Sequence, residues 1–101
     1  MTAPIKIGEL ELTEALSQLP EWKRDEQWLV RRFRFTDYLT GITFVQRVAQ
    51  EAESRNHHPL IAIDYKNITV KWTTWHAGGL TAEDLASARL TDEAYAAIQR
   101  P

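Results

Sequence analysis

The spacing of apolar and polar residues along the chain predicts strands and helices in distinct stretches. Apolar and polar side chains alternate between residues 28 and 35 and again between residues 68 and 73, a period of two that is typical of half-buried strands. Between residues 38 and 55, apolar residues recur every three or four positions, which indicates an amphipathic helix. We expect its buried stripe to consist of Tyr38, Ile42, Val45, Val48, Ala49 and Ala52.

Residues that favour helix ends place the first two helices. We expect a short helix to begin after Thr13 and to stop at Pro20, because a proline ends a helix at the residue before it. The long middle helix should begin after Thr36 or Asp37 and run to about Arg55. The residues before Thr13 could form a frayed arm or an added edge strand.

A last helix is predicted after the break at Ala77-Gly78-Gly79. Thr81 can cap it, and Asp84 three residues later has the spacing of a capping box. Thr91-Asp92 could restart the helix as a separate turn, so its continuity is left open. Its apolar stripe should consist of Leu85, Ala88, Tyr95 and Ile98.

The strands are predicted to form two hairpins, in residues 21–35 and 60–73. Their turns should lie at residues 25–27 and at Lys66-Asn67. With the helices, this gives the order α-β-β-α-β-β-α. We therefore predict one α+β domain over residues 1–101, with a four-stranded antiparallel sheet and helices packed on one face.

The strand at residues 28–35 departs from simple alternation. Trp28 and Val30 fall on the same side as Arg32 and Arg34, which allows a bulge. We interpret these arginines, together with Arg31, as a solvated strand face rather than a nucleic-acid site, because the net charge of −2 gives no general attraction to nucleic acid.

Composition removes several classes of chemistry. The chain of 101 residues has no cysteine, which excludes disulfides and thiolate catalysis. It has no apolar run long enough for a membrane span and no signal-peptide pattern at its start, so we expect a cytoplasmic protein. No serine lies in a strand–turn–helix elbow, and the pair Gly78-Gly79 lacks the lysine of a phosphate-binding loop.

The three histidines are the candidate chemistry, and they lie in two short segments. His57 and His58 precede Pro59, which should hold His58 extended, so both rings should project from a helix-to-strand junction. Neighbouring imidazoles can divide donor and acceptor roles near neutral pH, which fits general acid–base catalysis. We expect them to meet the segment at residues 73–76, where His76 lies, in one pocket.

Other interpretations of these residues stay open. The histidine pair could be exposed loop residues, or the three histidines with Glu53 or Asp84 could in principle bind zinc. Against zinc, no HExxH pair is present, and the adjacent rings of His57 and His58 should diverge.

Seven residues resemble the signature of the pterin-4a-carbinolamine dehydratases, also named 4a-hydroxytetrahydrobiopterin dehydratases. The family pattern is an acidic or similar residue, three spacers, His, His or Asn, and Pro, followed at set distances by an aromatic residue, His or Trp, and Asp. The residues that fill it here are Glu53, His57, His58, Pro59, Tyr65, Trp75 and Asp84. Trp22 matches a tryptophan of the family's first strand, and the resemblance covers roughly Leu12 to Ala88.

The resemblance implies a four-stranded antiparallel sheet with helices on one side, in homodimers or homotetramers. It implies that a pterin, 4a-hydroxytetrahydropterin, loses water to give quinonoid dihydropterin during tetrahydrobiopterin recycling, with no metal or organic cofactor. It assigns acid–base catalysis to His57 and orientation of the pterin ring to His58, with a shared proton transfer left open. The substrate-binding residues that it implies are Trp22, Asn56, Thr73, Thr74, Trp75 and His76.

Trp75 stands where many family members have histidine, so the usual third imidazole is missing. His76 is adjacent, but on a strand it would point to the opposite face, so activity or stereochemical preference could be altered. Structural roles are the simpler interpretation of three matched residues: Tyr65 in the core, Asp84 as a helix cap and Trp22 as a hairpin anchor. An alternative function also stays open, that of a non-catalytic scaffold, assembly factor or transcription coactivator on the same fold.

Overall fold

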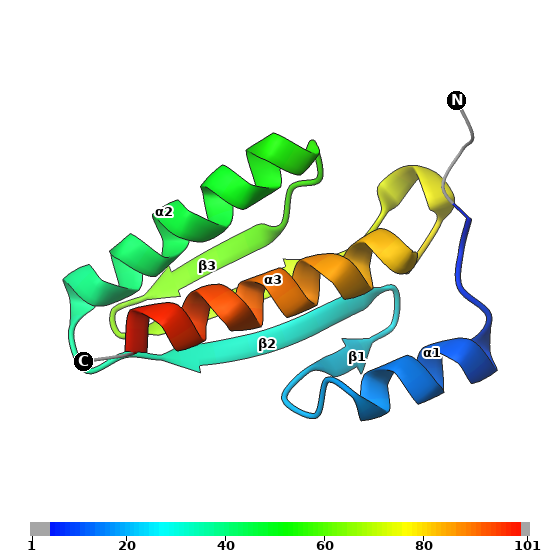
Figure 1. The fold of residues 1–101 in the computed structure, drawn as a ribbon, viewed down its shortest axis with the longest axis horizontal. Helices are drawn as coiled ribbons and strands as arrows, with labels where there is room; N and C mark the ends of the chain where they lie inside the picture. Colours follow the sequence, from blue (N-terminus) through cyan, green and yellow to red (C-terminus); the bar gives the residue numbers. More distant parts are fainter. Residues whose placement is uncertain (1–4, 100–101) are drawn as a thin grey trace.

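The structure, a computed structural model, describes residues 5–99 and contains the predicted elements in the predicted order. A single turn of 3-10 helix, η1, lies between the last strand and the last helix. The elements are α1 (Glu9–Ser17), β1 (Lys23–Asp25), β2 (Trp28–Arg34), α2 (Tyr38–Arg55), β3 (Leu60–Asp64), β4 (Asn67–Trp72), η1 (Trp75–Ala77) and α3 (Ala82–Gln99) (Figure 1).

The four strands form one antiparallel sheet in the order β1-β2-β4-β3, which confirms the predicted fold class. The long central pair is β2 and β4, whose register runs from Leu29 opposite Trp72 to Arg34 opposite Asn67. This pairing is unbroken along β2, so the bulge suggested by the sequence does not form. The alternation instead places Arg31 on the same side as the buried Leu29 and Phe33, apart from Arg32 and Arg34.

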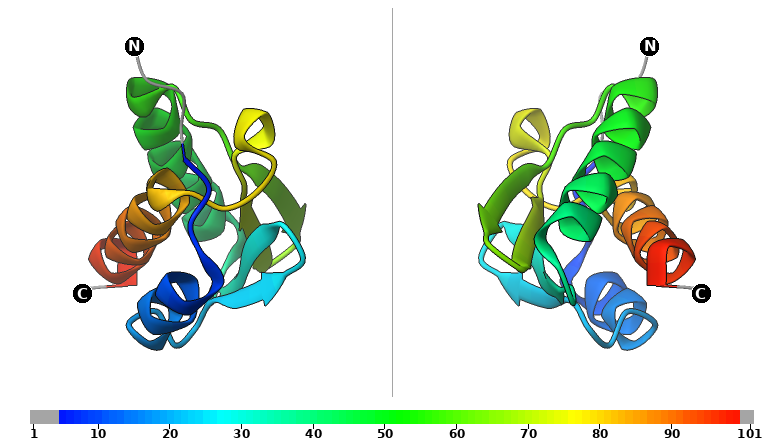
Figure 2. Two further views of the ribbon diagram at one scale, coloured as in Figure 1. Left: turned by 90° about the vertical axis from the view of Figure 1, so that its right-hand side faces the viewer. Right: turned by 90° about the vertical axis from the view of Figure 1, so that its left-hand side faces the viewer.

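All three helices cover one face of the sheet and leave the other face open (Figure 2). The core lies between these two layers, with Leu29, Phe33, Ile68 and Val70 from the sheet and Phe44, Val48, Ala52, Ala88 and Ala94 from the helices. α2 and α3 also contact each other directly. This packing brings the last turn of α2 next to the first turn of α3, where the histidine segment lies.

Helix α1 begins earlier than the capping signal predicted. Its N-cap is Gly8, and Thr13 lies inside the helix, where its hydroxyl donates to the carbonyl of Glu9. A threonine within a helix can bond back to the preceding turn, so its presence does not by itself mark a start. Before α1, the Ile7 amide donates to the Leu80 carbonyl. Residues 1–4 of the predicted arm lie outside the described residues.

Helix α2 begins after Asp37, whose carboxylate accepts from the Thr40 amide, and its last residue is Arg55, as predicted. Its buried stripe, however, is rotated from the predicted one. Tyr38 is 45% exposed and Ala49 is exposed, whereas Phe44 is fully buried against Phe33 and Phe35. The residues of α2 that are buried are Gly41, Phe44, Val48 and Ala52.

The second hairpin turns one residue earlier than expected. Asp64 pairs with Asn67, so the turn consists of Tyr65 and Lys66, and Tyr65 takes a left-handed backbone with φ of 54°. This position leaves Tyr65 64% exposed, stacked on Tyr38, so its predicted place in the core was wrong.

α3 runs without interruption through residues 91–92. Among the described residues, no helix combines the length and apolar character needed to cross a membrane.

Candidate active site

The histidine pair leaves the end of α2 in a defined direction. Asn56 closes the helix in the left-handed conformation, with φ of 51°, a region that asparagine adopts more readily than most residues. The His57 amide then donates back to the Ala52 carbonyl at 3.0 Å. Pro59 excludes further helix, so the chain passes directly into β3. Both imidazoles therefore start from a fixed backbone between α2 and β3.

The ring of His57 is held by a buried carboxylate from α3. Its Nε2 lies 2.7 Å from Oδ1 of Asp84, and the His57 side chain is 12% exposed while that of Asp84 is 0% exposed. A carboxylate oxygen can only accept, so Nε2 carries the shared hydrogen. We assign this tautomer from the hydrogen-bond network. In the neutral ring, Nδ1 is then left with a free lone pair.

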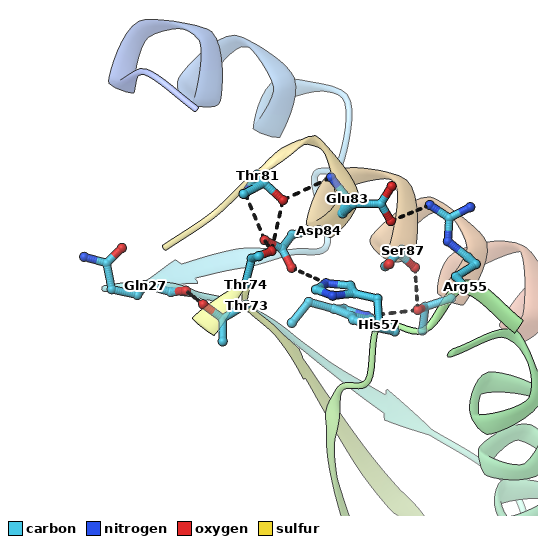
Figure 3. A network of polar contacts seen from close by, with 11 residues as sticks. Gln27, Arg55, His57, Thr73, Thr74, Thr81, Glu83, Asp84 and Ser87 are labelled. Atoms are coloured by element: carbon cyan, nitrogen blue, oxygen red, sulfur yellow. Dashed lines mark hydrogen bonds and ion pairs between the residues drawn. The ribbon is translucent and has the colours of Figure 1, made fainter. Parts of the chain in front are cut away.

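The other oxygen of Asp84 is bound equally firmly (Figure 3). Oδ2 accepts from the Thr81 amide at 2.9 Å and from the Thr74 hydroxyl at 2.8 Å. The Thr81 hydroxyl, 2.9 Å from that of Thr74, donates to it and accepts from the Glu83 amide. This arrangement is the predicted capping box, and it leaves no hydroxyl in the group unpaired. Asp84 thus starts α3 and orients His57 at once.

His58 lies beside this buried pair but in a more open setting. Its Nε2 is 2.8 Å from Oε1 of Glu53, and the two side chains are 55% and 81% exposed. Glu53 lies in the last turn of α2, so the bond turns the second imidazole back along the helix. An exposed contact of this kind contributes little to stability. The ring of His58 therefore remains accessible to a small molecule.

Two other predicted binding residues, Thr73 and Trp75, line a cavity of ≈170 Å³ that neither His57 nor His58 lines, so this cavity is not the shared pocket expected from the sequence. Thr73 donates its hydroxyl to the Gln27 carbonyl, whereas its neighbour Thr74 faces Asp84 (Figure 3). Trp75 is 76% exposed, and its ring meets that of Trp28 edge to face at 5.2 Å. The cavity is lined by Gln27, Trp28, Thr73, Trp75, Gly78 and Gly79. The neighbouring side chains of Thr73 and Thr74 therefore have different partners: Thr73 bonds to Gln27 beside the cavity, and Thr74 bonds to Asp84.

Three predicted site residues lie outside both the histidine pair with its carboxylates and this cavity. Trp22 is 4% exposed in the core, where its ring packs edge to face on Phe33 and its Nε1 donates to Asp92 at 2.8 Å. His76 is exposed in η1, and Asn56 is exposed at the helix end. Because His76 lies in a 3-10 turn, the strand alternation expected for it does not apply.

Within residues 5–99, no three histidine, cysteine, aspartate or glutamate side chains are grouped closely enough to hold a metal ion. The bonds of His57 and His58 go instead to two different carboxylates. Each imidazole is therefore oriented separately. An imidazole that is oriented by a carboxylate is a group suited to proton transfer.

The fold and the site together define a class: a small α+β protein that carries a carboxylate-oriented histidine and a second, accessible histidine beside it. A sequence model described as "Pterin 4 alpha carbinolamine dehydratase" matches residues 6–94. The chain belongs to this family.

Individual relatives agree with this assignment. A Picosynechococcus protein named "Putative pterin-4-alpha-carbinolamine dehydratase" is 39% identical over 88 residues, which cover 87% of this chain and 96% of the relative. A Brucella melitensis structure titled transcriptional coactivator/pterin dehydratase has a TM-score of 0.85 at 29% identity, with 89% of this chain and 98% of that chain covered. A pterin dehydratase-like RuBisCO assembly factor of the alpha-carboxysome shares the fold at a TM-score of 0.61 and 20% identity, over 73% of this chain and 86% of that chain.

Proposed function

We propose that the chain is a hydro-lyase that converts 4a-hydroxytetrahydropterin to quinonoid dihydropterin by histidine acid–base catalysis. The observation that carries this proposal is the bond between His57 and the buried Asp84. It places the ring hydrogen on Nε2 and leaves Nδ1 as an acceptor, which is what a general base requires. Family membership supports the substrate class and the dehydratase reaction.

The reaction removes one hydroxide and one proton from the pterin. The bond between C4a and the hydroxyl oxygen breaks, a proton joins that oxygen to form water, and N5 loses its proton as the double bond to C4a forms. We assign the N5 proton to Nδ1 of His57. His58, which is accessible and paired with Glu53, orients the ring and in its protonated form can donate to the leaving hydroxyl. Proton abstraction by a positioned base such as His57 contributes about 10²–10⁴ in rate.

The substrate-binding residues of the proposal come from both sides of the strand end. Thr73 and Trp75 line the cavity of ≈170 Å³, and its aromatic wall suits a planar ring. Thr74 contributes by holding Asp84, and Asn56 by ending α2 at the right residue. Trp22 contributes as a core residue, and His76, which is exposed in η1, is accessible to a substrate.

The test is a turnover assay with freshly generated 4a-hydroxytetrahydrobiopterin, measured against the spontaneous dehydration. In His57→Ala we expect kcat to fall about 10²–10⁴-fold. In His58→Ala we expect KM to rise more than kcat falls, because its main role is orientation. Thermal unfolding of each variant shows whether the fold is retained. Absence of any acceleration by the pure wild-type protein would remove the proposal.

We place this reaction in tetrahydrobiopterin recycling, in the cytoplasm, in a homodimer or homotetramer. The assembly is supported by large apolar side chains on the outside of the subunit. Exposed examples are Tyr38, Leu39, Leu60, Ile63 and Tyr65. β3 is also an edge strand with free backbone groups, which a second copy can satisfy. Sedimentation equilibrium of the pure protein distinguishes a monomer from either assembly.

The same exposed apolar residues favour a second candidate function, that of a non-catalytic binding protein. The Brucella melitensis structure is titled a coactivator as well as a dehydratase. A protein that only binds a partner has no chemical use for an imidazole oriented by a buried carboxylate, so we prefer the enzyme. A stoichiometric protein partner recovered from cells, together with no pterin turnover, would reverse this preference.

A further inference from the structure

We propose that Trp72 is a positioning residue, which fixes the plane of the His57 imidazole and thereby the direction of its Nδ1 lone pair. Trp72 is the last residue of β4 and is 3% exposed. Its ring lies almost parallel to that of His57, with the centroids 5.4 Å apart and the planes 17° apart. This is an offset stack, one of the arrangements that aromatic rings prefer.

The bond to Asp84 alone does not fix the imidazole. A single hydrogen bond at Nε2 restrains the far end of the ring, but small coupled rotations about the Cα–Cβ and Cβ–Cγ bonds can still tilt the ring plane. Such a tilt would carry Nδ1 out of line with a substrate proton. Contact of the ring face with the Trp72 indole removes this freedom, because the face can lie flat in only one plane. Asp84 therefore sets the tautomer and Trp72 sets the plane.

The indole of Trp72 is itself held by a hydrogen bond to α3. Its Nε1 donates to the Thr91 hydroxyl at 3.1 Å, and that hydroxyl donates to the Ser87 carbonyl at 2.7 Å. The cavity beside the indole is only ≈10 Å³, room for about one water molecule, so the ring cannot tip into a second position. Thr91 lies on α3, as does Asp84. One helix thus provides both constraints on His57, directly through Asp84 and indirectly through Trp72.

This inference deepens the proposed function and rests on it for its kinetic test, but not for its structural test. The structural test is proton NMR of the His57 ring in the substrate-free protein, with the resonances assigned by their loss in His57→Gln. The face of an indole shields protons stacked above it. In Trp72→Leu we therefore expect the His57 ring protons to move downfield, and in Trp72→Phe to move less, because phenylalanine keeps an aromatic face.

The kinetic test compares the same variants in the 4a-hydroxytetrahydrobiopterin assay. We expect kcat of Trp72→Leu to fall about 10- to 100-fold while KM stays close to that of the wild type, because a misaligned base slows chemistry more than binding. Trp72→Phe should recover part of kcat. If Trp72→Leu does not fold, Thr91→Val replaces it, since this change removes only the hydroxyl that holds the indole.

Phe44→Leu is the matched control, because it removes a buried ring that contacts Phe33 and Phe35. It should lose stability while keeping kcat and the His57 resonances. The inference is overturned if the His57 resonances of Trp72→Leu, or of Thr91→Val in its place, move no further than those of Phe44→Leu. It is also overturned if the wild type is active and kcat of Trp72→Leu, or of Thr91→Val in its place, falls no more than kcat of Phe44→Leu. If the wild type is inactive, the proposed function fails by itself, and the NMR comparison still decides the role of Trp72.

Discussion

Replacing Asp84 by asparagine tests the site more sharply than removing a histidine, because it keeps the shape and changes only one hydrogen-bonding group. The asparagine oxygen can take the place of Oδ2 and accept from the Thr81 amide and the Thr74 hydroxyl. Its amide nitrogen then faces Nε2 of His57 as a donor. The imidazole must accept there, so its hydrogen moves to Nδ1 and the lone pair needed for catalysis is lost.

The expected effect follows from that loss. If Nδ1 is the base for the N5 proton, Asp84→Asn should lower kcat by about the whole rate contribution of a positioned general base, which is 10²–10⁴-fold. This is about 3–5 kcal/mol of barrier, at about 1.4 kcal/mol for each factor of ten. KM should change little, because the exposed His58 and the cavity that contains Trp75 are untouched.

Stability should fall less than activity. The two bonds at Oδ2 become bonds to a neutral amide oxygen, and each loses about 1 kcal/mol, so these two bonds together lower the free energy of unfolding by about 2 kcal/mol. Asp92→Asn is the matched control on the same helix. Asp92 accepts from Trp22 at 2.8 Å and from Arg31 at 2.6 Å, away from His57. This variant should be destabilised in a similar way and keep its kcat.

The assay combines turnover with nitrogen-15 NMR of the His57 ring, which reports directly which nitrogen carries hydrogen. We expect the wild type to be protonated at Nε2 and Asp84→Asn at Nδ1. The reasoning is refuted if Asp84→Asn changes the tautomer while kcat stays at the wild-type value. It is equally refuted if Asp92→Asn loses as much kcat as Asp84→Asn, since the effect would then be one of stability alone.

Two further predictions concern stability. Ser87 has the only buried side-chain polar atom without a hydrogen-bond partner among residues 5–99, so Ser87→Ala should raise the free energy of unfolding by about 1 kcal/mol; a loss measured in urea would contradict this. The Thr40 amide holds the pKa of Asp37 below its ordinary value, so this carboxylate stabilises the fold above its unfolded pKa and loses that contribution as the pH falls through the folded pKa. Asn is also a good N-cap, so Asp37→Asn should lose less stability than the wild type as the pH falls below about 4. If the free energies of unfolding of the wild type and Asp37→Asn fall in parallel with pH, this prediction is wrong.

Most of the fold could be predicted because local signals and the global fold agree. The cap at Asp37, the alternation of β4 and the capping box at Thr81 each depend on residues close in sequence. The errors arose where a local pattern has two solutions. Counting from Tyr38 gave a helical stripe that is out of phase with the true one, because the aromatic cluster around Phe44 decides which side of α2 faces the sheet.

Arg31 shows why burial in β2 was harder to predict. The sequence placed it with its neighbouring arginines on a wet face, but strand alternation puts it on the helix side. There its guanidinium lies 4.4 Å from the Phe33 ring centroid and pairs with Asp92. Charged side chains are rarely buried without such a partner, and the partner lies 61 residues away in sequence. The alternation itself was visible in the sequence, but no local pattern could identify Asp92 as the partner of Arg31.

The candidate site divides in the same way. The histidine pair and its junction follow from Pro59 and the helix end, so sequence reasoning could find them. The bond between His57 and Asp84 joins residues 27 positions apart; the sequence suggested Asp84 as a helix cap or a possible zinc ligand, and the family resemblance included both residues, but none of these predicted the bond itself. Trp72 carried no signal at all, because a buried tryptophan on a strand is expected in any core. Its contact with His57 depends on how α2 and β4 end beside each other.

The groups of the candidate site are held in place by hydrogen bonds at the ends of regular elements. A buried carboxylate is costly unless it is fully bonded, and Asp84 meets this condition through the first turn of α3. The positive end of the helix dipole adds a favourable interaction there. The same bonds that make the charge tolerable also fix Oδ1 toward His57. Stability and orientation therefore have one cause, so a change that loosens the start of α3 should lower activity before it unfolds the protein.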